Sequence, residues 1–383
     1  MALTHRERVT LALDHRETDR VPVDLGGGPA TMVHPVAYGR LLEFLGFPDE
    51  ELVEGPRGEG QVVVPGERVL KRFDIDVRGF SLGQPDGAPN KKIDANSYMD
   101  EWGVTWSKTG PTAPYINVLG PFQRAVEPHA QDLEMLRWPV PDDPGRVRGL
   151  RSRIELARKE TDFALVLNLP NSTFALTQRL RGFSEHLEDL LLNQNFADAI
   201  QERVTDIICG MAERALREVG GLIDAVSFAD DMGIQTQAFM SRELYRSMVK
   251  RHHARFVATL RRHTKAKIIM HSDGAIYDLL PDIIDCGVEV INPVQVNAQD
   301  MDPERLKREF GADLCFWGGV DTQKVLPNGT PAEVADEVRR RTGDLGRGGG
   351  YVLASVHNIQ EDVPPENIVA MFDTATSAAA MAG

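Results

Sequence analysis

Short apolar runs that alternate with helical stretches constrain the fold of this chain more than any other feature. These runs occur at residues 21–24, 74–80, 163–169, 225–228, 266–270, 288–292, 314–317 and 351–354. Most of them are continuously apolar, as strands are when a parallel sheet is covered on both faces. Eight strands in alternation with helices predict an α/β fold, a (β/α)8 TIM barrel. An open doubly wound sheet is the alternative, and it is disfavoured because no strand is followed by a glycine fingerprint that opens a helix.

The chain is longer than such a barrel requires. A barrel of this type takes about 250 residues, and the sequence has 383. We expect the remainder to form an N-terminal helical extension and an insertion at 82–148 that is rich in Gly, Pro and Asn. The first helix is predicted at 4–15, with Thr4 and Glu7 as a capping box. The insertion is too poor in apolar residues for a core of its own, so residues 1–383 are predicted to form a single domain.

Charge and cysteine content argue against several classes of protein. Acidic residues number 57 and basic residues 43, which gives a net charge of −14. This balance argues against binding to nucleic acid and against a polybasic membrane anchor. The three cysteines, Cys209, Cys286 and Cys315, form no CxxC pair and predict reduced thiols in the cytoplasm. No signal peptide and no apolar run of about 18 residues is found, so a cytoplasmic location is expected.

Polar side chains follow the predicted strands at the end where function gathers in barrels of this type. They are His34, Asp230, Asp231, His271, Asp273, Asn292, Gln295, Asp321, His357 and Asn358. Since the carboxyl ends of all the strands meet at one face of a barrel, we expect these side chains to surround a common pocket.

His271, Asp273 and His357 are the candidate metal ligands. Residues two apart at a strand end point to the same side, so His271 and Asp273 can act together. His357 follows the last strand, which is adjacent to the first when the barrel closes. Two imidazoles and a carboxylate with an open position resemble a catalytic zinc site more than a structural one. The alternative is that both histidines orient a polar substrate by hydrogen bonds.

The remaining strand-end residues are candidates for proton transfer and substrate binding. Asp230 and Asp231 are candidate catalytic groups, as is His357, and only one of two successive aspartates can readily face the pocket. Each aspartate could instead cap the loop that follows. The candidate substrate-binding residues are His34, Asn292, Gln295, Asp321 and Asn358. We place His252 and His253, in the middle of a helix predicted at 241–263, at the surface or the edge of the core.

Several segments resemble the uroporphyrinogen decarboxylase superfamily. They include the opening at 6–23, His-Ser-Asp-Gly at 271–274, Phe-Trp-Gly-Gly-Val-Asp at 316–321, Gly-Thr-Pro-Ala-Glu at 329–333 and the stretch from His357 to Met371. The resemblance keeps its order over nearly the whole chain. It implies a (β/α)8 barrel, in agreement with the fold predicted from the apolar runs.

Two chemistries are implied by this resemblance. The decarboxylases carry an Arg-Gln-Ala-Gly-Arg stretch after the first strand that binds substrate carboxylates, whereas residues 25–34 here contain no arginine. The corrinoid-dependent methyltransferases hold zinc with a His-x-Cys pair and a later cysteine near the last strand. In this chain Asp273 and His357 stand at the positions of those two cysteines. That donor set would suit zinc or another divalent metal.

The sequence is therefore interpreted as a methyltransferase that demethylates a small methylated compound. Any corrinoid would arrive on a separate partner protein, because the chain has no corrinoid-binding module. Two alternatives stay open: a decarboxylase or lyase of a small carboxylate, and a non-catalytic binding or partner subunit.

Overall fold

A curled parallel sheet forms the centre of the protein in this computed structural model, which describes residues 3–55, 61–110 and 113–377. Seven strands are hydrogen-bonded in the order β13-β12-β11-β10-β9-β8-β3. Their bounds are β3 (Val77–Ser81), β8 (Ala164–Asn171), β9 (Ala225–Ala229), β10 (Lys267–His271), β11 (Val290–Asn292), β12 (Cys315–Trp317) and β13 (Tyr351–Val352). Each joins its neighbour in parallel, as the alternation of strands and helices predicts.

The segment at 22–24 occupies the eighth position and closes the barrel. Val23 forms a parallel bridge with Leu353 beyond β13, and the Asp24 amide donates to the Leu353 carbonyl at 2.9 Å. On the other side of the segment at 22–24, the Asp76 amide donates to the Val23 carbonyl at 3.0 Å. The predicted strand at 21–24 is thus reduced to a bridge. One reason is that Pro22 has no N–H to donate to a ladder.

Alternation along the strands separates two cores. Leu165 and Leu167 of β8 belong to the large core between the sheet and the outer helices. Ala164 and Val166 belong to a smaller core inside the barrel, which also contains Leu13 of α1 (His5–Leu13). Neighbouring residues of a strand face opposite sides of a sheet, which explains the division.

Helix α1 closes the end of the barrel where the strands begin. The Gly350 amide, just before β13, donates to the Ala12 carbonyl at 2.7 Å. The predicted capping box of Thr4 and Glu7 is present at the start of this helix. Because α1 fills the amino end of the barrel, the interior is left open at the carboxyl end.

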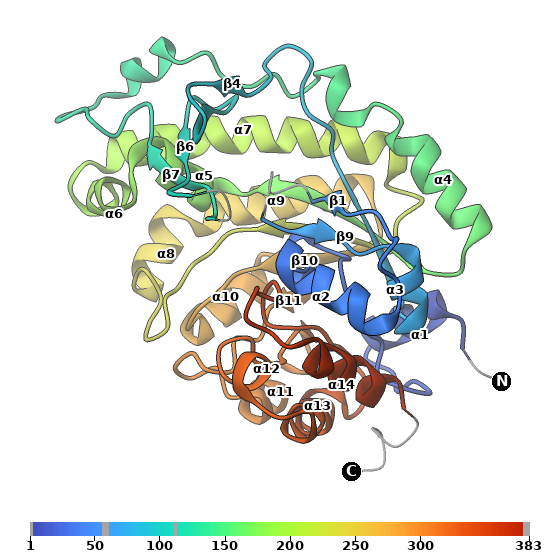
Figure 1. The fold of residues 1–383 in the computed structure, drawn as a ribbon. Coiled ribbons are helices and arrows are strands. Elements are labelled where there is room, and N and C mark those ends of the chain that lie inside the picture. The colour runs from blue at the N-terminus through green and yellow to red at the C-terminus, as the bar shows by residue number, and fades with distance from the viewer. Residues whose placement is uncertain (1–2, 56–60, 111–112, 378–383) are drawn as a thin grey trace.

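The remaining helices surround the sheet (Figure 1). They are α2 (Pro35–Leu45), α3 (Glu67–Arg72), α4 (Leu150–Glu160), α5 (Thr173–Arg181), α6 (Phe183–Leu192), α7 (Gln194–Val219), α8 (Arg242–Met248), α9 (Lys250–His263), α10 (Leu280–Asp285), α11 (Pro303–Phe310), α12 (Val325–Asn328), α13 (Pro331–Gly346) and α14 (Pro365–Thr376). Short 3-10 turns occur at η1 (Pro29–Thr31), η2 (Ala130–Met135), η3 (Pro144–Val147) and η4 (Tyr277–Leu279).

The helix predicted at 241–263 is divided at Val249, whose φ of −119° interrupts the helical backbone. Over the described residues, none of the helices is long and apolar enough to cross a bilayer.

Two smaller antiparallel sheets lie outside the barrel. Strands β1 (Val53–Glu54) and β2 (Val63–Val64) pair with each other. The insertion contains a second sheet with the order β4-β5-β6-β7. Its strands are β4 (Lys91–Lys92), β5 (Ser97–Met99), β6 (Thr105–Ser107) and β7 (Ile116–Leu119). Trp102 and Phe122 of the insertion join the large core. The insertion is therefore anchored on the barrel by apolar contacts.

Candidate active site

A cavity of about 590 Å³ opens at the carboxyl end of the barrel. It is lined by side chains of the barrel strands and of the loops that follow them: Asn168, Ser227, Asp231, His271, Asn292, Trp317 and His357. The insertion supplies Tyr98, Trp106 and Tyr115 to the same cavity. The cavity is of the size that binds organic ligands in proteins.

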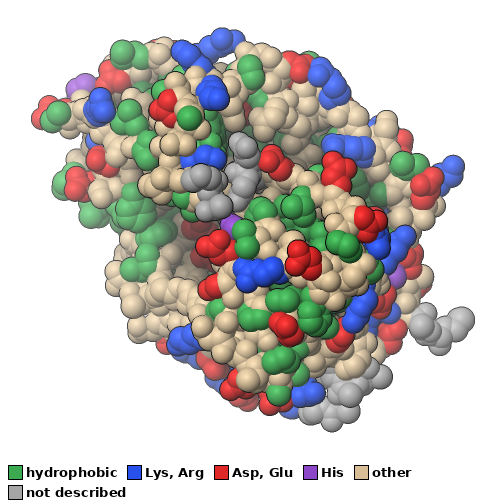
Figure 2. All heavy atoms as spheres, in the orientation of Figure 1, with side chains coloured by type: hydrophobic (Ala, Val, Ile, Leu, Met, Phe, Trp, Pro, Cys, Tyr) green, Lys and Arg blue, Asp and Glu red, His purple; other side chains and the backbone are tan. Residues whose placement is uncertain are grey.

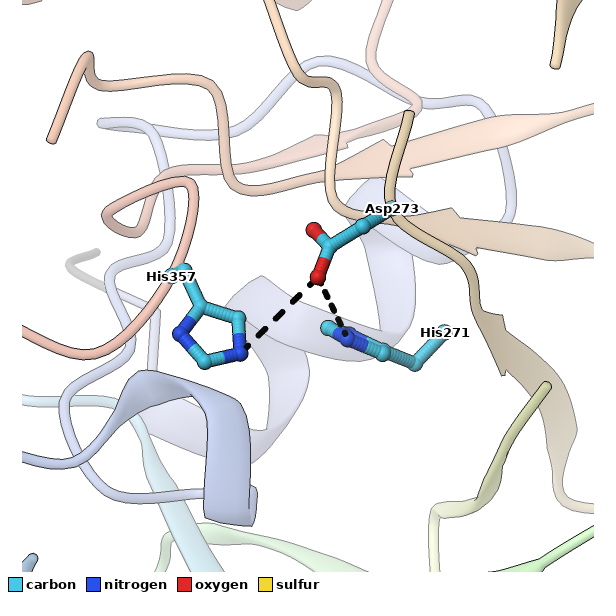
Figure 3. Close-up of side chains that lie close together, drawn as sticks. All are labelled: His271, Asp273 and His357. Atoms are coloured by element: carbon cyan, nitrogen blue, oxygen red, sulfur yellow. Dashed lines mark ion pairs between the residues drawn. The ribbon is translucent and has the colours of Figure 1, made fainter. Parts of the chain in front are cut away.

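Three candidate ligands converge beside this cavity (Figure 3): His271 and His357 line it, and Asp273 lies next to both of them. His271 ends β10, Asp273 follows two residues later, and His357 lies in the loop after β13. The Asp273 Oδ2 atom is 3.6 Å from His271 Nε2 and 3.9 Å from His357 Nε2. One donor atom from each side chain can be chosen so that all three lie within 4.8 Å of one another. The structure thus brings together the three residues that the sequence indicates as metal ligands.

Asn292 fixes the orientation of the His271 ring. The Asn292 amide nitrogen donates to the Trp317 carbonyl at 3.0 Å, so its Oδ1 atom is the acceptor for His271 Nδ1 at 2.6 Å. Nδ1 of His271 therefore carries a proton, and Nε2 is the ring nitrogen that faces Asp273. Hydrogen bonds of this kind set which nitrogen of a histidine binds a metal.

The electrostatics of the cluster favour a positive charge at His271 Nε2. His271 is 8% exposed, and burial lowers its pKa. The carboxylates of Asp273 and Asp231 act in the opposite direction and raise the pKa of His271 to about 9. Carboxylates that stabilise a proton at Nε2 also stabilise a metal cation at that position.

The cluster passes a simple test of its fit to a divalent metal. Two ligands of a tetrahedral zinc ion at 2.0–2.1 Å lie about 3.3 Å apart. The distances from Asp273 Oδ2 to the two histidine nitrogens, 3.6 and 3.9 Å, are larger, and the three donor atoms all lie within 4.8 Å of one another. Imidazole nitrogen and carboxylate oxygen are both ordinary zinc ligands. His271, Asp273 and His357 can therefore hold such an ion after small side-chain movements.

The two adjacent aspartates take different positions. Asp231 lines the cavity, and its Oδ1 atom accepts from the Asp273 amide at 3.1 Å. Asp230 is fully buried and does not line the cavity. Its carboxylate accepts from the amides of Phe174 and Ala175 at the start of α5. Of the two predicted catalytic aspartates, Asp231 is the one placed to meet a ligand.

His252 and His253 are buried, contrary to the prediction, and Asp230 is a partner of His253. His253 Nε2 lies 2.8 Å from Asp230 Oδ2, and His253 Nδ1 lies 2.8 Å from the Tyr245 hydroxyl. His252 contacts the Thr205 hydroxyl at 3.1 Å. Both histidines are 1% exposed, so the prediction of a surface or core-edge position is wrong. Polar partners on other elements, which a helical period does not reveal, satisfy both rings.

Four of the five predicted substrate-binding residues do not line the cavity and instead support loops. Gln295 accepts from the Gly274 amide at 2.7 Å, and Asp321 accepts from the Gln323 amide at 2.7 Å. His34 Nδ1 accepts from the Val36 amide at the start of α2, and Asn358 donates to the Pro29 carbonyl at 2.6 Å. Asn292 is the one that lines the cavity.

Asp24 is a cavity residue that the sequence does not single out. It is 2% exposed and accepts from Trp317 Nε1 at 2.8 Å and from the Gly27 amide at 2.7 Å. Burial raises the pKa of Asp24 to about 6, although these hydrogen bonds act to lower it. The sequence places Asp24 within the first predicted strand. It does not show whether the Asp24 side chain faces the cavity, because that depends on where the barrel closes.

A comparison with known families decides the classification. A family model described as uroporphyrinogen decarboxylase (URO-D) matches residues 120–378. This chain belongs to the uroporphyrinogen decarboxylase family. The matched residues include His271, Asp273 and His357, and the predicted resemblance is confirmed. No curated protein matches the sequence.

Solved structures show that this family member shares its fold with a known protein. A methyltransferase from Methanosarcina mazei aligns over 97% of this chain and 98% of its own, with a TM-score of 0.67 and 16% identity. A β-glucosidase from Pyrococcus furiosus aligns over 80% of this chain and 82% of its own, with a TM-score of 0.43 and 11% identity. The likeness to the methyltransferase confirms the predicted barrel-type fold.

Proposed function

We propose that this family member is a metal-assisted methyltransferase that removes a methyl group from a methylated compound. The observation that supports this most is the convergence of His271, Asp273 and His357 beside a ligand-sized cavity. A corrinoid carried by a partner protein is the proposed methyl acceptor. The Methanosarcina protein of similar fold is itself described as a methyltransferase.

The three converging side chains are the proposed ligands of a divalent metal, with zinc as the first candidate. When bound there, the metal would act as a Lewis acid toward the heteroatom that carries the methyl group. Three protein ligands are typical of catalytic zinc sites, which keep a position for substrate. Asn292 would hold His271 in the orientation that binding requires. Asp231, at the cavity wall, would exchange a proton with the substrate heteroatom.

The charge of the cavity argues against the tetrapyrrole substrate for which the family is named. Among the described residues that line it, the only cations besides histidine are Arg146 and Arg179. Arg146 is paired with Glu101, which also lines the cavity. A substrate with many carboxylates would need more counter-ions than these. On one face of the protein, acidic and basic side chains are interspersed (Figure 2), so no broad positive surface is visible there to attract such a substrate.

Methyl transfer to free cob(I)alamin tests this proposal. The zinc-loaded full-length protein would be mixed with dimethyl sulfide, methanol, methylamine or methoxybenzene, and methylation of the corrinoid would be followed by absorbance. We expect zinc-dependent transfer from at least one donor and no transfer by the His357→Ala variant. Transfer that is unchanged by zinc removal or by this substitution would contradict the proposal. Release of carbon dioxide from small carboxylates without methyl transfer would favour a decarboxylase.

Asn292 offers a test of how the site is organised. We expect Asn292→Ala to weaken zinc binding by about 10- to 100-fold, as loss of a hydrogen bond to a metal-binding histidine does. Asn292→Asp keeps an oxygen opposite His271 Nδ1 and is expected to retain most of the affinity. Zinc titration monitored by competition with a chromogenic chelator measures both. Asn117→Ala, on the exposed strand β7, is the control. Equal losses in the alanine and aspartate variants would contradict the proposed role.

A further inference from the structure

Three successive glycines, at 26–28, lie between the first strand position and η1, and the fold requires two of them. Gly26 has a φ of +80°, and a Cβ there would lie 2.7 Å from Pro65 Cδ. A Cβ on Gly27 would lie 2.5 Å from Asp24 Oδ1 and 2.7 Å from Val77 Cγ1. Contacts this short are not tolerated in proteins, so neither position accepts a side chain without rearrangement.

Gly28 differs from its two neighbours. Its φ of −137° and ψ of 161° are extended and available to any residue. Within 4 Å, a Cβ at this position would meet Asn168 Oδ1 alone, at an ordinary contact distance of 3.5 Å. Gly28 also lines the cavity, so a side chain there would extend into it. Neither backbone conformation nor packing in the described structure explains a glycine at position 28.

The open space beside Gly28 is close to the metal-ligand cluster. Asn168 Nδ2 donates to the Gly27 carbonyl at 2.9 Å, which joins this loop to β8. On the other side, Asn358 Nδ2 donates to the Pro29 carbonyl at 2.6 Å. Asn358 directly follows His357. Gly28 therefore lies between β8 and the loop that carries one of the proposed ligands.

One part of the cavity wall is aromatic and suits a flat group. Tyr98 and Trp106 are paired across β5 and β6, with nearly parallel rings whose planes differ by 13°. Tyr115 packs edge-on against Tyr98, with ring centroids 5.0 Å apart. All three aromatic side chains line the cavity that Gly28 lines. Aromatic walls of this kind favour planar rings over small polar molecules.

We propose that the space beside Gly28 is a subsite for a ring-sized part of the substrate, and that residue 28 limits how large this part can be. The inference rests on the proposed function only for the statement that the ligand is a methyl donor. A donor such as methanol would leave this subsite empty. The class of substrate indicated is a methylated compound whose remaining part contains a planar ring.

A cysteine placed at position 28 tests this subsite without knowledge of the substrate. The full-length Gly28→Cys variant would be treated under native conditions with methyl methanethiosulfonate and, separately, with benzyl methanethiosulfonate. Each reagent forms a disulfide with an accessible thiolate and releases methanesulfinate. The three native cysteines are buried, and burial raises the pKa of each thiol, to about 11 in Cys286 and about 12 in Cys315. The unmodified protein is therefore expected to remain unlabelled until it is denatured.

We expect mass spectrometry to show one added group per Gly28→Cys chain with either reagent. The thermal midpoint of this variant should stay within a few degrees of the parent, whereas Gly27→Ala should lower it clearly. Failure of the benzyl reagent to react, or a loss of stability as large as that of Gly27→Ala, would overturn the proposal. The labelling does not depend on metal or methyl transfer. The labelling result can therefore be interpreted even when no methyl transfer is observed.

Discussion

Replacing His271 with alanine is expected to reduce zinc affinity by more than 100-fold and to abolish zinc-dependent methyl transfer. Loss of a hydrogen bond to a metal-binding histidine already costs about 10- to 100-fold in affinity, and this substitution removes the ligand itself. It also removes the imidazole that lies beside two carboxylates. His271 Nε2 is 3.6 Å from Asp273 Oδ2 and 3.9 Å from Asp231 Oδ1. Zinc titration of the purified variant measures the first effect, and the cob(I)alamin assay measures the second.

His129→Ala is the matched control for this prediction. His129 is exposed in the insertion and does not line the cavity. This variant should keep the zinc affinity and thermal midpoint of the parent. A His271→Ala protein that is folded and binds zinc as tightly as the control would show that the cluster is not the metal site.

Replacing Asp76 with alanine is expected to cause the largest loss of stability, about 3–5 kcal/mol. Asp76 is fully buried, and its carboxylate accepts from Arg8 Nη1 and Arg20 Nη1, each at 2.6 Å. It also accepts from the Val23 amide at 2.7 Å. These bonds join α1 and the closing segment at 22–24 to the beginning of β3. Removing the carboxylate would leave two buried guanidinium groups short of a counter-ion, which is costly because charge in a protein interior must be compensated.

The exposed pair of Arg72 and Asp373 provides the comparison. Its two hydrogen bonds, at 2.7 and 2.9 Å, have a geometry similar to those of the buried cluster. Because water already solvates exposed charges, Asp373→Ala should cost less than about 1 kcal/mol. Urea unfolding of both variants, followed by circular dichroism, measures the difference. Equal losses in the two variants would show that burial of Asp76 does not control the stability of the barrel closure.

Sequence patterns were sufficient for the barrel because they reflect burial. Continuous apolar runs mark strands that are covered on both faces, and the predicted runs correspond to the parallel strands and to the closing segment at 22–24. Strand ends were less certain. The predicted strand at 351–354 extends only over Tyr351–Val352, since hydrogen bonding, and not apolarity, sets where a ladder ends.

The candidate ligands were also visible in the sequence, because a residue at a barrel strand end has few directions to point. His271 and Asp273 follow one strand and His357 follows another, and the structure brings all three together. The same reasoning failed to separate Asp230 from Asp231. Their difference depends on the amides at the start of α5, which are distant in sequence and donate to the Asp230 carboxylate.

Residues on irregular segments could not be placed from the sequence. Asp321 follows a strand but accepts from the Gln323 amide, as short polar side chains in loops often do. Gln295 accepts from the Gly274 amide, which is distant in sequence. The cavity aromatics Tyr98 and Trp106 lie in an insertion whose pairing has no strong period. Trp106 packs against the large core and Tyr98 is paired with Trp106 across the strands, contacts that only the fold reveals.

Anomalous diffraction from zinc-soaked crystals of the full-length protein would test the proposed site most directly. The metal-site hypothesis predicts one strong peak at the zinc edge, about 2.0–2.2 Å from His271 Nε2, His357 Nε2 and an oxygen of Asp273. A map in which zinc binds elsewhere and the space between these three side chains holds no anomalous density would contradict it.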